Sequence, residues 1–356
     1  MKPDRGFGKG RKMHFGVMDH LDLSSDLPQH EHYENRLRLG ELYDQAGFHC
    51  YHVTEHHCTP LGGGAAPSVF LAALAQRTKR LRIGTLVYAL PAHHPLRLFE
   101  EICMVDQISG GRLDIGFGRG SVPMELAYFG IDPDEAREIY DEALIIIRQG
   151  LIYGRIDFAG RHFDLRNVPL HLKSFQKPMP PVWYGVHSTE SAVRAARARF
   201  NVVMNEGTQI AAQYIDDFKR ELDASGFDGT ERMIGLARTV VVAPSDEEAM
   251  AIARRAHLSF QKSFRWLHTL HGVVPKLSGL EATYDELMQA ERAIAGSPET
   301  VLRFLQQQHA ETGANYAVLR FAFGDMSFGD MLRSVELFVQ SVMPRLRTME
   351  PAVQPV

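Results

Sequence analysis

The sequence predicts an eight-stranded parallel β/α barrel, written (β/α)8. Eight short stretches rich in apolar and β-branched residues recur along the 356 residues, and a stretch with helical periodicity follows each of them. The chain length falls within the range of such barrels, and a hydrophobic content of 45% is enough to build a large core. An open, doubly wound sheet is the alternative fold, but the number of repeats favours a closed barrel.

Four strand–helix repeats occupy the first part of the chain, up to residue 150. The predicted strands are 13–19, 48–54, 81–90 and 112–117. The helices that follow them are 30–45, 67–78, 95–108 and 132–150. Gly47 suits the left-handed position just past the first helix, and Pro67 suits the first turn of the second helix.

The alternation resumes after an excursion rich in aromatic, Gly and Pro residues. The remaining predicted strands are 182–186, 201–205, 234–243 and 316–321. The predicted helices are 188–198, 208–225, 246–260 and 328–345, with an extra helix at 298–312. The sequence therefore predicts a TIM barrel with a hairpin-like insertion at about 152–180 and an irregular insertion at about 261–295. The barrel domain spans 13–346, between a flexible basic arm at 1–12 and a C-terminal tail at 347–356.

The composition excludes several classes of partner. A net charge of −4 and a pI near 6.5, without a dense basic stripe, argue against nucleic acid. No run of roughly 18 apolar residues is present, so no membrane span is predicted. Three cysteines without a C-x-x-C pair suggest a reducing compartment, and the basic start lacks an apolar signal region. We therefore expect a soluble, cytoplasmic protein.

A candidate catalytic group follows the second predicted strand. Glu55, His56 and His57 stand where this strand runs into a loop. In α/β folds the carboxyl ends of parallel strands carry the chemistry, and an imidazole can serve as acid or base near neutral pH. The alternative is that the three residues are solvated loop residues, or that one histidine caps the next helix.

Two further strand ends have features of an anion site. Arg119 lies between two glycines after the fourth strand, where small neighbours would let a phosphate approach the guanidinium. His187, Ser188 and Ser191 lie where the fifth strand feeds a helix, and hydroxyls at a helix start can cradle a phosphate. The alternatives are a surface arginine in a turn and simple N-capping of the helix by Ser188.

Other site types find little support. Seventeen histidines invite a metal reading, but no H-E-x-x-H motif is present and the stretch from Asp19 to Asp22 is the nearest approach to a strand-one histidine pair. A metal-dependent barrel hydrolase stays a minor alternative, and no metal site is predicted. A G-x-S-x-G nucleophile elbow, a P-loop and a dinucleotide fingerprint are all missing from the sequence.

Six ordered motifs carry a resemblance to a known family. They are AGFHCYHVTEHH, IGTLVYALPAHHP, DQISGG with LDIGFGRG, VWYGVHSTES, GSPETV and VELFVQSVMPRL. With these motifs, the chain resembles the bacterial luciferase-like monooxygenases, a flavin-dependent barrel family, over nearly its whole length.

The resemblance implies a (β/α)8 barrel enzyme that uses reduced FMN and dioxygen to oxidise a small organic substrate, aldehyde-like or ketone-like. It also implies a separate flavin reductase as partner and a homodimer, for which the predicted helix 67–78 offers the small residues Ala72, Ala73 and Ala75. Two alternatives stay open. One is an oxidoreductase of the same superfamily that uses a deazaflavin coenzyme for hydride transfer, and the other is a non-catalytic flavin-binding subunit.

The resemblance assigns roles to individual residues. His56 matches the histidine that is catalytic in the luciferase α subunit, and Arg119 matches the arginine that binds the FMN phosphate. Ser188 and Ser191 match the hydroxyl partners of that phosphate. Leu86–Val87 lies where the family can carry a non-prolyl cis peptide beneath the flavin ring.

The chain departs from the family pattern at two of these positions. Gly118 stands where luciferase has a cysteine near the flavin, which leaves substrate and light emission open. His187 stands where luciferase has a glutamate near the phosphate, so that a protonated imidazole could add positive charge there. The insertion at 261–295 matches the mobile lid of the family by position only.

Overall fold

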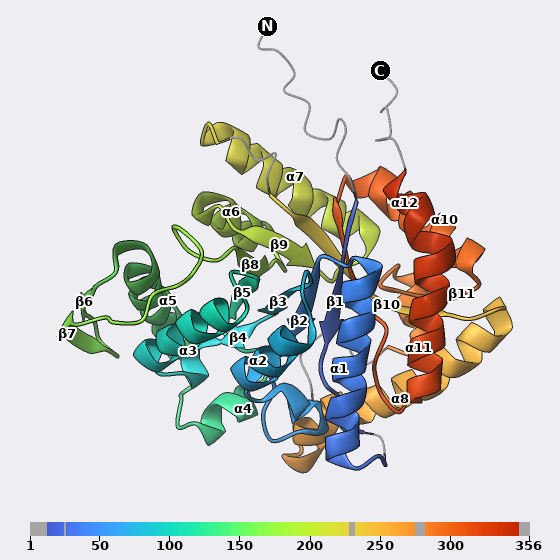
Figure 1. Ribbon diagram of the computed structural model, residues 1–356, viewed down its shortest axis with the longest axis horizontal. Coiled ribbons are helices and arrows are strands. Elements are labelled where there is room, and N and C mark those ends of the chain that lie inside the picture. Colours follow the sequence, from blue (N-terminus) through green and yellow to red (C-terminus); the bar gives the residue numbers. More distant parts are fainter. Residues whose placement is uncertain (1–12, 25, 228–231, 275–281, 349–356) are drawn as a thin grey trace, which may run out of the picture.

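The computed structural model describes residues 13–24, 26–227, 232–274 and 282–348. The predicted arm at 1–12 and the tail from 349 lie outside the described residues. Eight parallel strands form a barrel with the helices outside it (Figure 1). In barrel order these strands are β1 (His14–Asp19), β2 (Cys50–Val53), β3 (Arg82–Thr85), β5 (Leu113–Gly118), β8 (Val182–Gly185), β9 (Asn201–Met204), β10 (Ile234–Val242) and β12 (Tyr316–Arg320).

Three strand pairings close the ring. The last strand, β12, pairs with β1 through the register Gly16↔Val318. Strand β10 pairs with β12 on one side and with β9 on the other, through Gly235↔Val203. The predicted closed barrel is confirmed, and the alternative of an open sheet is wrong.

The helices cover the outside of the barrel, and short strands supplement it. The helices of the outer layer are α1 (Gln29–Ala46), α2 (Pro67–Arg77), α3 (Pro95–Ile108), α5 (Ala136–Tyr153), α6 (Thr189–Ala198), α7 (Thr208–Ala224), α8 (Asp246–Leu270), α10 (Pro298–Thr312), α11 (Phe328–Leu337) and α12 (Met343–Arg347). The additional strands are β4 (Tyr88–Ala89) beside β5, and β11 (Ala293–Gly296) beside β10. The insertion at 152–180 contains the antiparallel pair β6 (Ile156–Ala159) and β7 (Asp164–Val168), as predicted.

The second insertion differs from its prediction. We expected an irregular segment from residue 261, but α8 continues without a break to Leu270. The reason is its apolar face, which continues through Phe260, Phe264 and Leu267, all buried. A short helix, α9 (Tyr284–Gln289), and β11 follow. The insertion is therefore largely regular where it is described, and residues 275–281 lie outside the described part.

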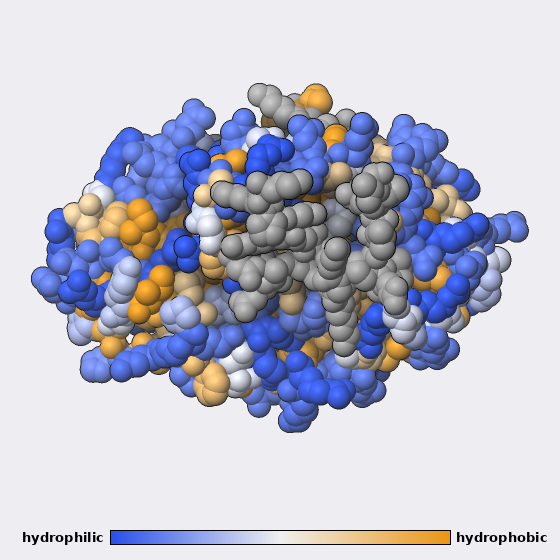
Figure 2. Space-filling model, turned by 90° about the horizontal axis from the view of Figure 1, so that it is seen from above, coloured by the Kyte–Doolittle hydropathy of each residue, from blue (hydrophilic) through white to orange (hydrophobic). Residues whose placement is uncertain are grey.

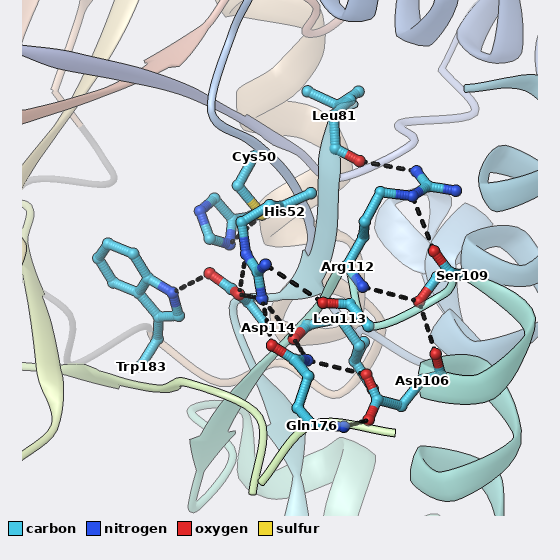
Figure 3. Close-up of polar contacts among 12 residues, drawn as sticks. Cys50, His52, Leu81, Asp106, Ser109, Arg112, Leu113, Asp114, Gln176 and Trp183 are labelled. Carbon is cyan, nitrogen blue, oxygen red and sulfur yellow. Dashed lines mark hydrogen bonds and ion pairs between the residues drawn. The ribbon is translucent and has the colours of Figure 1, made fainter. Parts of the chain in front are cut away.

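A polar layer fills the barrel interior toward the amino ends of the strands. Asp114 forms an ion pair with Arg82 at 2.6 Å. It also accepts a hydrogen bond from Trp183 Nε1 at 2.8 Å (Figure 3). His52 Nε2 lies 2.8 Å from the hydroxyl of Tyr316 across the barrel. Because these buried polar groups have hydrogen-bond partners, they hold the strands in fixed positions at the amino-terminal end of the barrel.

The molecule has two distinct ends. The start of β1 and the helix α12 lie at one end of the molecule, where Arg347 of α12 lies over the ring of Phe15 (Figure 1). Figure 2 views this end, and the coloured part of its surface is mostly hydrophilic, with small separate hydrophobic patches. The carboxyl ends of the barrel strands face the other end, where α8 and the short helix α4 (Pro123–Tyr128) lie (Figure 1). We call this second end the barrel mouth. Among the described helices, none is long and apolar enough to cross a membrane.

Candidate active site

His56 lies at the barrel mouth with a carboxylate partner. It follows β2, is buried, and its Nδ1 lies 3.0 Å from Oε1 of Glu125. Glu125 comes from α4, which begins with Pro123 at its first position. The ring of His56 also stacks on that of His20, with 5.6 Å between centroids and an angle of 14°. Two strand ends and one helix therefore converge on His56.

Glu55 points to different partners. Its carboxylate lies 2.8 Å from Nε2 of His57 and 2.9 Å from Nε2 of His93, and it accepts a bond from the backbone N–H of Ala89. Burial acts to raise the pKa of Glu55, but the hydrogen bonds from the two imidazoles outweigh it and lower the pKa. The same ion pair raises the pKa of His93 against the effect of burial. Glu55 thus ties the loop after β2 to the loop after β3.

His20 is a neutral neighbour of His56. It follows β1, and burial lowers its pKa well below the ordinary value, with the positive charges of Arg320 and His56 acting in the same direction. The edge of its ring meets Phe260 of α8, with 5.3 Å between the centroids. A second imidazole next to the candidate catalytic residue therefore stays unprotonated at neutral pH.

The wall beside β3 and β5 explains one departure from the family pattern. The peptide bond between Leu86 and Val87 is cis, as the resemblance implied. A Cβ atom on Gly118 would lie 2.3 Å from Cγ2 of Val87. Val87 therefore occupies the space that a side chain at position 118 would need, and the cysteine of luciferase would not fit beside it.

The predicted anion site lies on the strand ends of β5 and β8. Arg119 is exposed and forms no hydrogen bond or ion pair with the described residues. Ser188 caps α6, and its hydroxyl accepts from the N–H of Ser191. The Ser191 hydroxyl accepts from the N–H groups of His187 and Ser188. The N-capping alternative for Ser188 is thus confirmed, and it leaves open whether the hydroxyls also bind a phosphate.

A carboxylate stands beside His187. Nδ1 of His187 lies 2.8 Å from Oε1 of Glu206, which follows β9. Burial acts to raise the pKa of Glu206, but the bond from His187 and backbone N–H groups lower it. A protonated His187 would therefore be neutralised by its partner, and the expectation of added positive charge near a phosphate is not supported.

Sequence reasoning missed Glu125, His20, His93 and Glu206 as members of this mouth. Glu125 lies 69 positions from His56, and such pairings follow only from the folded structure. One local signal existed, because Pro123 followed by Glu125 is typical of a helix start. In the described ranges no three His, Cys, Asp or Glu side chains are placed to hold a metal ion.

Comparison with known proteins agrees with this arrangement. The family described as luciferase-like monooxygenase matches residues 13–316. The protein y4wF of Sinorhizobium fredii is 39% identical over 94% of this chain and 98% of its own length. The oxygenase component of the flavin-dependent trigonelline monooxygenase of Acinetobacter baylyi is 26% identical over 93% of this chain and 95% of its own length.

Solved structures share the fold. The monooxygenase RslO1 from Streptomyces bottropensis superposes with a TM-score of 0.82 at 29% identity, covering 94% of this chain and 99% of that one. The oxygenating constituent of 3,6-diketocamphane monooxygenase from Pseudomonas putida, in complex with FMN, gives a TM-score of 0.79 at 18% identity, over 96% and 100%. An F420-dependent secondary alcohol dehydrogenase gives 0.73 at 17%, over 94% and 99%. Because the family model matches residues 13–316, which is most of the chain, the chain belongs to the luciferase-like monooxygenase family.

Proposed function

We propose that this protein is a monooxygenase that uses reduced FMN and dioxygen to oxidise a small organic substrate. The observation that carries the proposal is the buried pair of His56 and Glu125 at the barrel mouth, next to the neutral His20. A buried imidazole held by a carboxylate is suited to proton transfer. The same pair argues against a non-catalytic subunit, which would have no use for it.

The residues at the mouth fit FMN. Arg119 is an exposed guanidinium without a partner in the described part of the chain, and Gly118 and Gly120 keep its surroundings small. The N-terminus of α6 lies at the neighbouring strand end and favours an anion. The Ser188 hydroxyl accepts from the N–H of Ser191, and the Ser191 hydroxyl donates to the carbonyl of Ser188. To bind a phosphate, one of these hydroxyl side chains would have to rotate away from its present partner. Bound in its reduced form, FMN would supply the electrons that activate dioxygen.

The chain's own residues would then position the substrate and move a proton. His56 contacts Glu125 through Nδ1, so that proton exchange with a ligand falls to Nε2. Glu55 and His57 bond to each other and brace the loop that carries His56. The helix α8 walls the mouth, because Thr59 after β2 donates to the carbonyl of Ser263 at 2.8 Å. This wall limits the access of water to the reacting groups.

A separate flavin reductase and a second copy of this chain are the proposed partners. The trigonelline relative is an oxygenase component by name, which supports a divided system. For the homodimer, α2 and its neighbour α3 expose the large apolar residues Val69, Met104 and Ile108, and Ala73 of α2 is exposed too. Ala75, in contrast, is buried in the core and cannot contribute to such an interface. Light scattering is expected to give about twice the chain mass of 40.0 kDa, and a single-chain mass across micromolar concentrations would contradict the dimer.

A ligand comparison separates FMN from the deazaflavin alternative. Fluorescence titration of the full-length protein with FMN, riboflavin and coenzyme F420 is expected to rank FMN as the tightest ligand. Tighter binding of F420, together with hydride transfer from its reduced form to an added carbonyl compound, would replace the proposed function with that of a deazaflavin-dependent oxidoreductase.

A further inference from the structure

Resting on the proposed function, we infer that the barrel mouth holds a subsite for an anionic oxygen of the substrate, made by Arg320, His20 and Thr54. The substrate class it fits is a small organic carboxylate or phenolate. Three adjacent strands supply these residues at their carboxyl ends, because β12 pairs with β1 and β1 pairs with β2.

Each of the three residues has a buried polar atom without a hydrogen-bond partner. These atoms are Arg320 Nε, His20 Nδ1 and Thr54 Oγ1. His20 is 8% exposed and Thr54 is 5% exposed. Most buried polar groups in proteins do have partners. Three unsatisfied atoms on neighbouring strand ends therefore indicate a polar ligand that the subsite is built to receive.

The guanidinium of Arg320 is the charged member of the subsite. It lies 4.9 Å from the ring centroid of Phe260, and Phe260 in turn contacts His20. Burial, the largest effect, lowers the pKa of Arg320 to about 10, so that the group still carries its charge at neutral pH. A guanidinium has donors only. The ligand group that satisfies it must accept hydrogen bonds and is favoured when it is negative.

The two carboxylates whose charges act on Arg320, those of Asp19 and Asp22, already have other partners. Asp19 forms an ion pair with Arg36 at 3.2 Å and accepts a bond from Tyr51. Asp22 accepts bonds from Ser263 and from the N–H of Gly324. Arg320 itself forms no ion pair with any described residue. Its charge is therefore uncompensated by direct contact within the described chain.

The position of the subsite distinguishes a substrate group from the FMN phosphate. Around the ring, β12 is separated from β5 and β8, which carry the proposed phosphate site, by at least two other strands in either direction. The subsite instead adjoins the candidate catalytic residue, because His20 stacks on His56. An anion held by Arg320 would thus lie on the His56 side of the mouth.

The test measures binding without turnover, in full-length protein with and without FMN. The probes are benzoate and its neutral counterpart benzamide, measured by isothermal titration calorimetry. The variants are Arg320→Gln, Arg320→Lys as a charge-retaining form, and Arg255→Gln as a matched control. Arg255 lies on the same helix as Phe260, but it is half exposed and pairs with Asp330 on the outer surface.

The parent and Arg255→Gln are expected to bind benzoate at least ten-fold more tightly than benzamide. Arg320→Gln should lose benzoate affinity by roughly 10- to 100-fold, keep benzamide affinity, and keep FMN affinity within a few-fold. Arg320→Lys should retain the preference for benzoate. The inference is overturned if the parent shows no preference, or if Arg320→Gln weakens FMN and leaves benzoate unchanged. The benzoate and benzamide titrations without FMN need neither flavin nor oxygen, so their result can be interpreted even if the proposed function fails.

Discussion

At the scale of the residue, the candidate active site is built from partners that lie far apart in the chain. The tripeptide from Glu55 to His57 could be singled out from the sequence because it follows a strand. The different roles of its three residues could not be predicted from the sequence, because they depend on contacts with Glu125 and His93. His56 faces Glu125, whereas Glu55 holds His57. Alternation of side chains along an extended segment allows neighbouring residues to take opposite roles.

The first prediction separates His56 from His57. His56→Ala should keep FMN affinity within a few-fold and lose substrate oxidation by roughly 10²–10⁴-fold, because a positioned proton donor or acceptor is removed. His57→Ala should lower the melting temperature more than the rate, because it removes a partner of the buried Glu55. Single-turnover oxidation of prebound reduced FMN with a working substrate measures the step. An unchanged rate in His56→Ala would return this residue to a structural role.

The second prediction concerns the phosphate. Arg119→Ala should weaken FMN binding by about 1.5–3 kcal/mol, which is roughly 10- to 100-fold, because a charge-assisted bond is lost. Riboflavin, which lacks the phosphate, should bind the variant as it binds the parent. Fluorescence titration measures both ligands. Equal losses for the two would show that Arg119 does not hold the phosphate.

At the scale of the element, the predicted pattern and the structure agree where periodicity is strong. Seven of the eight barrel strands fall within the predicted stretches, and β5 extends one residue beyond its stretch to Gly118, because each is a short apolar run bounded by turn residues. The end of α8 was misplaced by ten residues, since polar residues from Gln261 to His271 hid a buried stripe that continues to Leu267. The short α4 was not predicted, because six residues carry too little periodicity.

The third prediction tests how α8 is seated against the barrel. Gly324 has a φ of +58°, and a Cβ there would lie 1.9 Å from the carbonyl oxygen of Ala256 in α8. Gly324→Ala should therefore lower the free energy of unfolding by roughly 2 kcal/mol or more, because backbone atoms cannot yield cheaply. Gly329→Ala is the matched control, since its nearest contact would be 3.9 Å away. Urea unfolding that ranks the two variants equally would contradict this seating.

At the scale of the whole molecule, the barrel places its buried histidines in very different surroundings. Burial, the largest effect, lowers the pKa of His52 to about 3 and the pKa values of His32 and His49 to about 4. Ring closure could be predicted from the repeat count, whereas these shifts could not, because they depend on which histidines the closed barrel covers. The sequence alone does not show which of the seventeen histidines are buried and therefore have a lowered pKa.

The fourth prediction follows from these depressed values. Between about pH 6.5 and 4 the unfolded chain binds protons at His32, His49 and His52 that the folded chain does not. Stability therefore rises with pH in this window and is lost as pH falls, by at most about 1.4 kcal/mol per pH unit for each such histidine. His52→Gln should reduce the slope of the free energy of unfolding against pH by the contribution of one histidine. Urea midpoints measured from pH 4.5 to 6.5 test this, and an unchanged slope would contradict a neutral buried His52.

The most direct test of flavin-dependent oxygenation is stopped-flow absorbance without added substrate. Full-length protein is loaded anaerobically with reduced FMN and mixed with air-saturated buffer. If the mouth binds the reduced flavin and excludes water, oxidised flavin should form with kinetics distinct from those of free reduced FMN, after a lag. Arg119→Ala should move the trace toward that of free FMN at limiting protein. Identical traces with and without the parent protein would contradict the account.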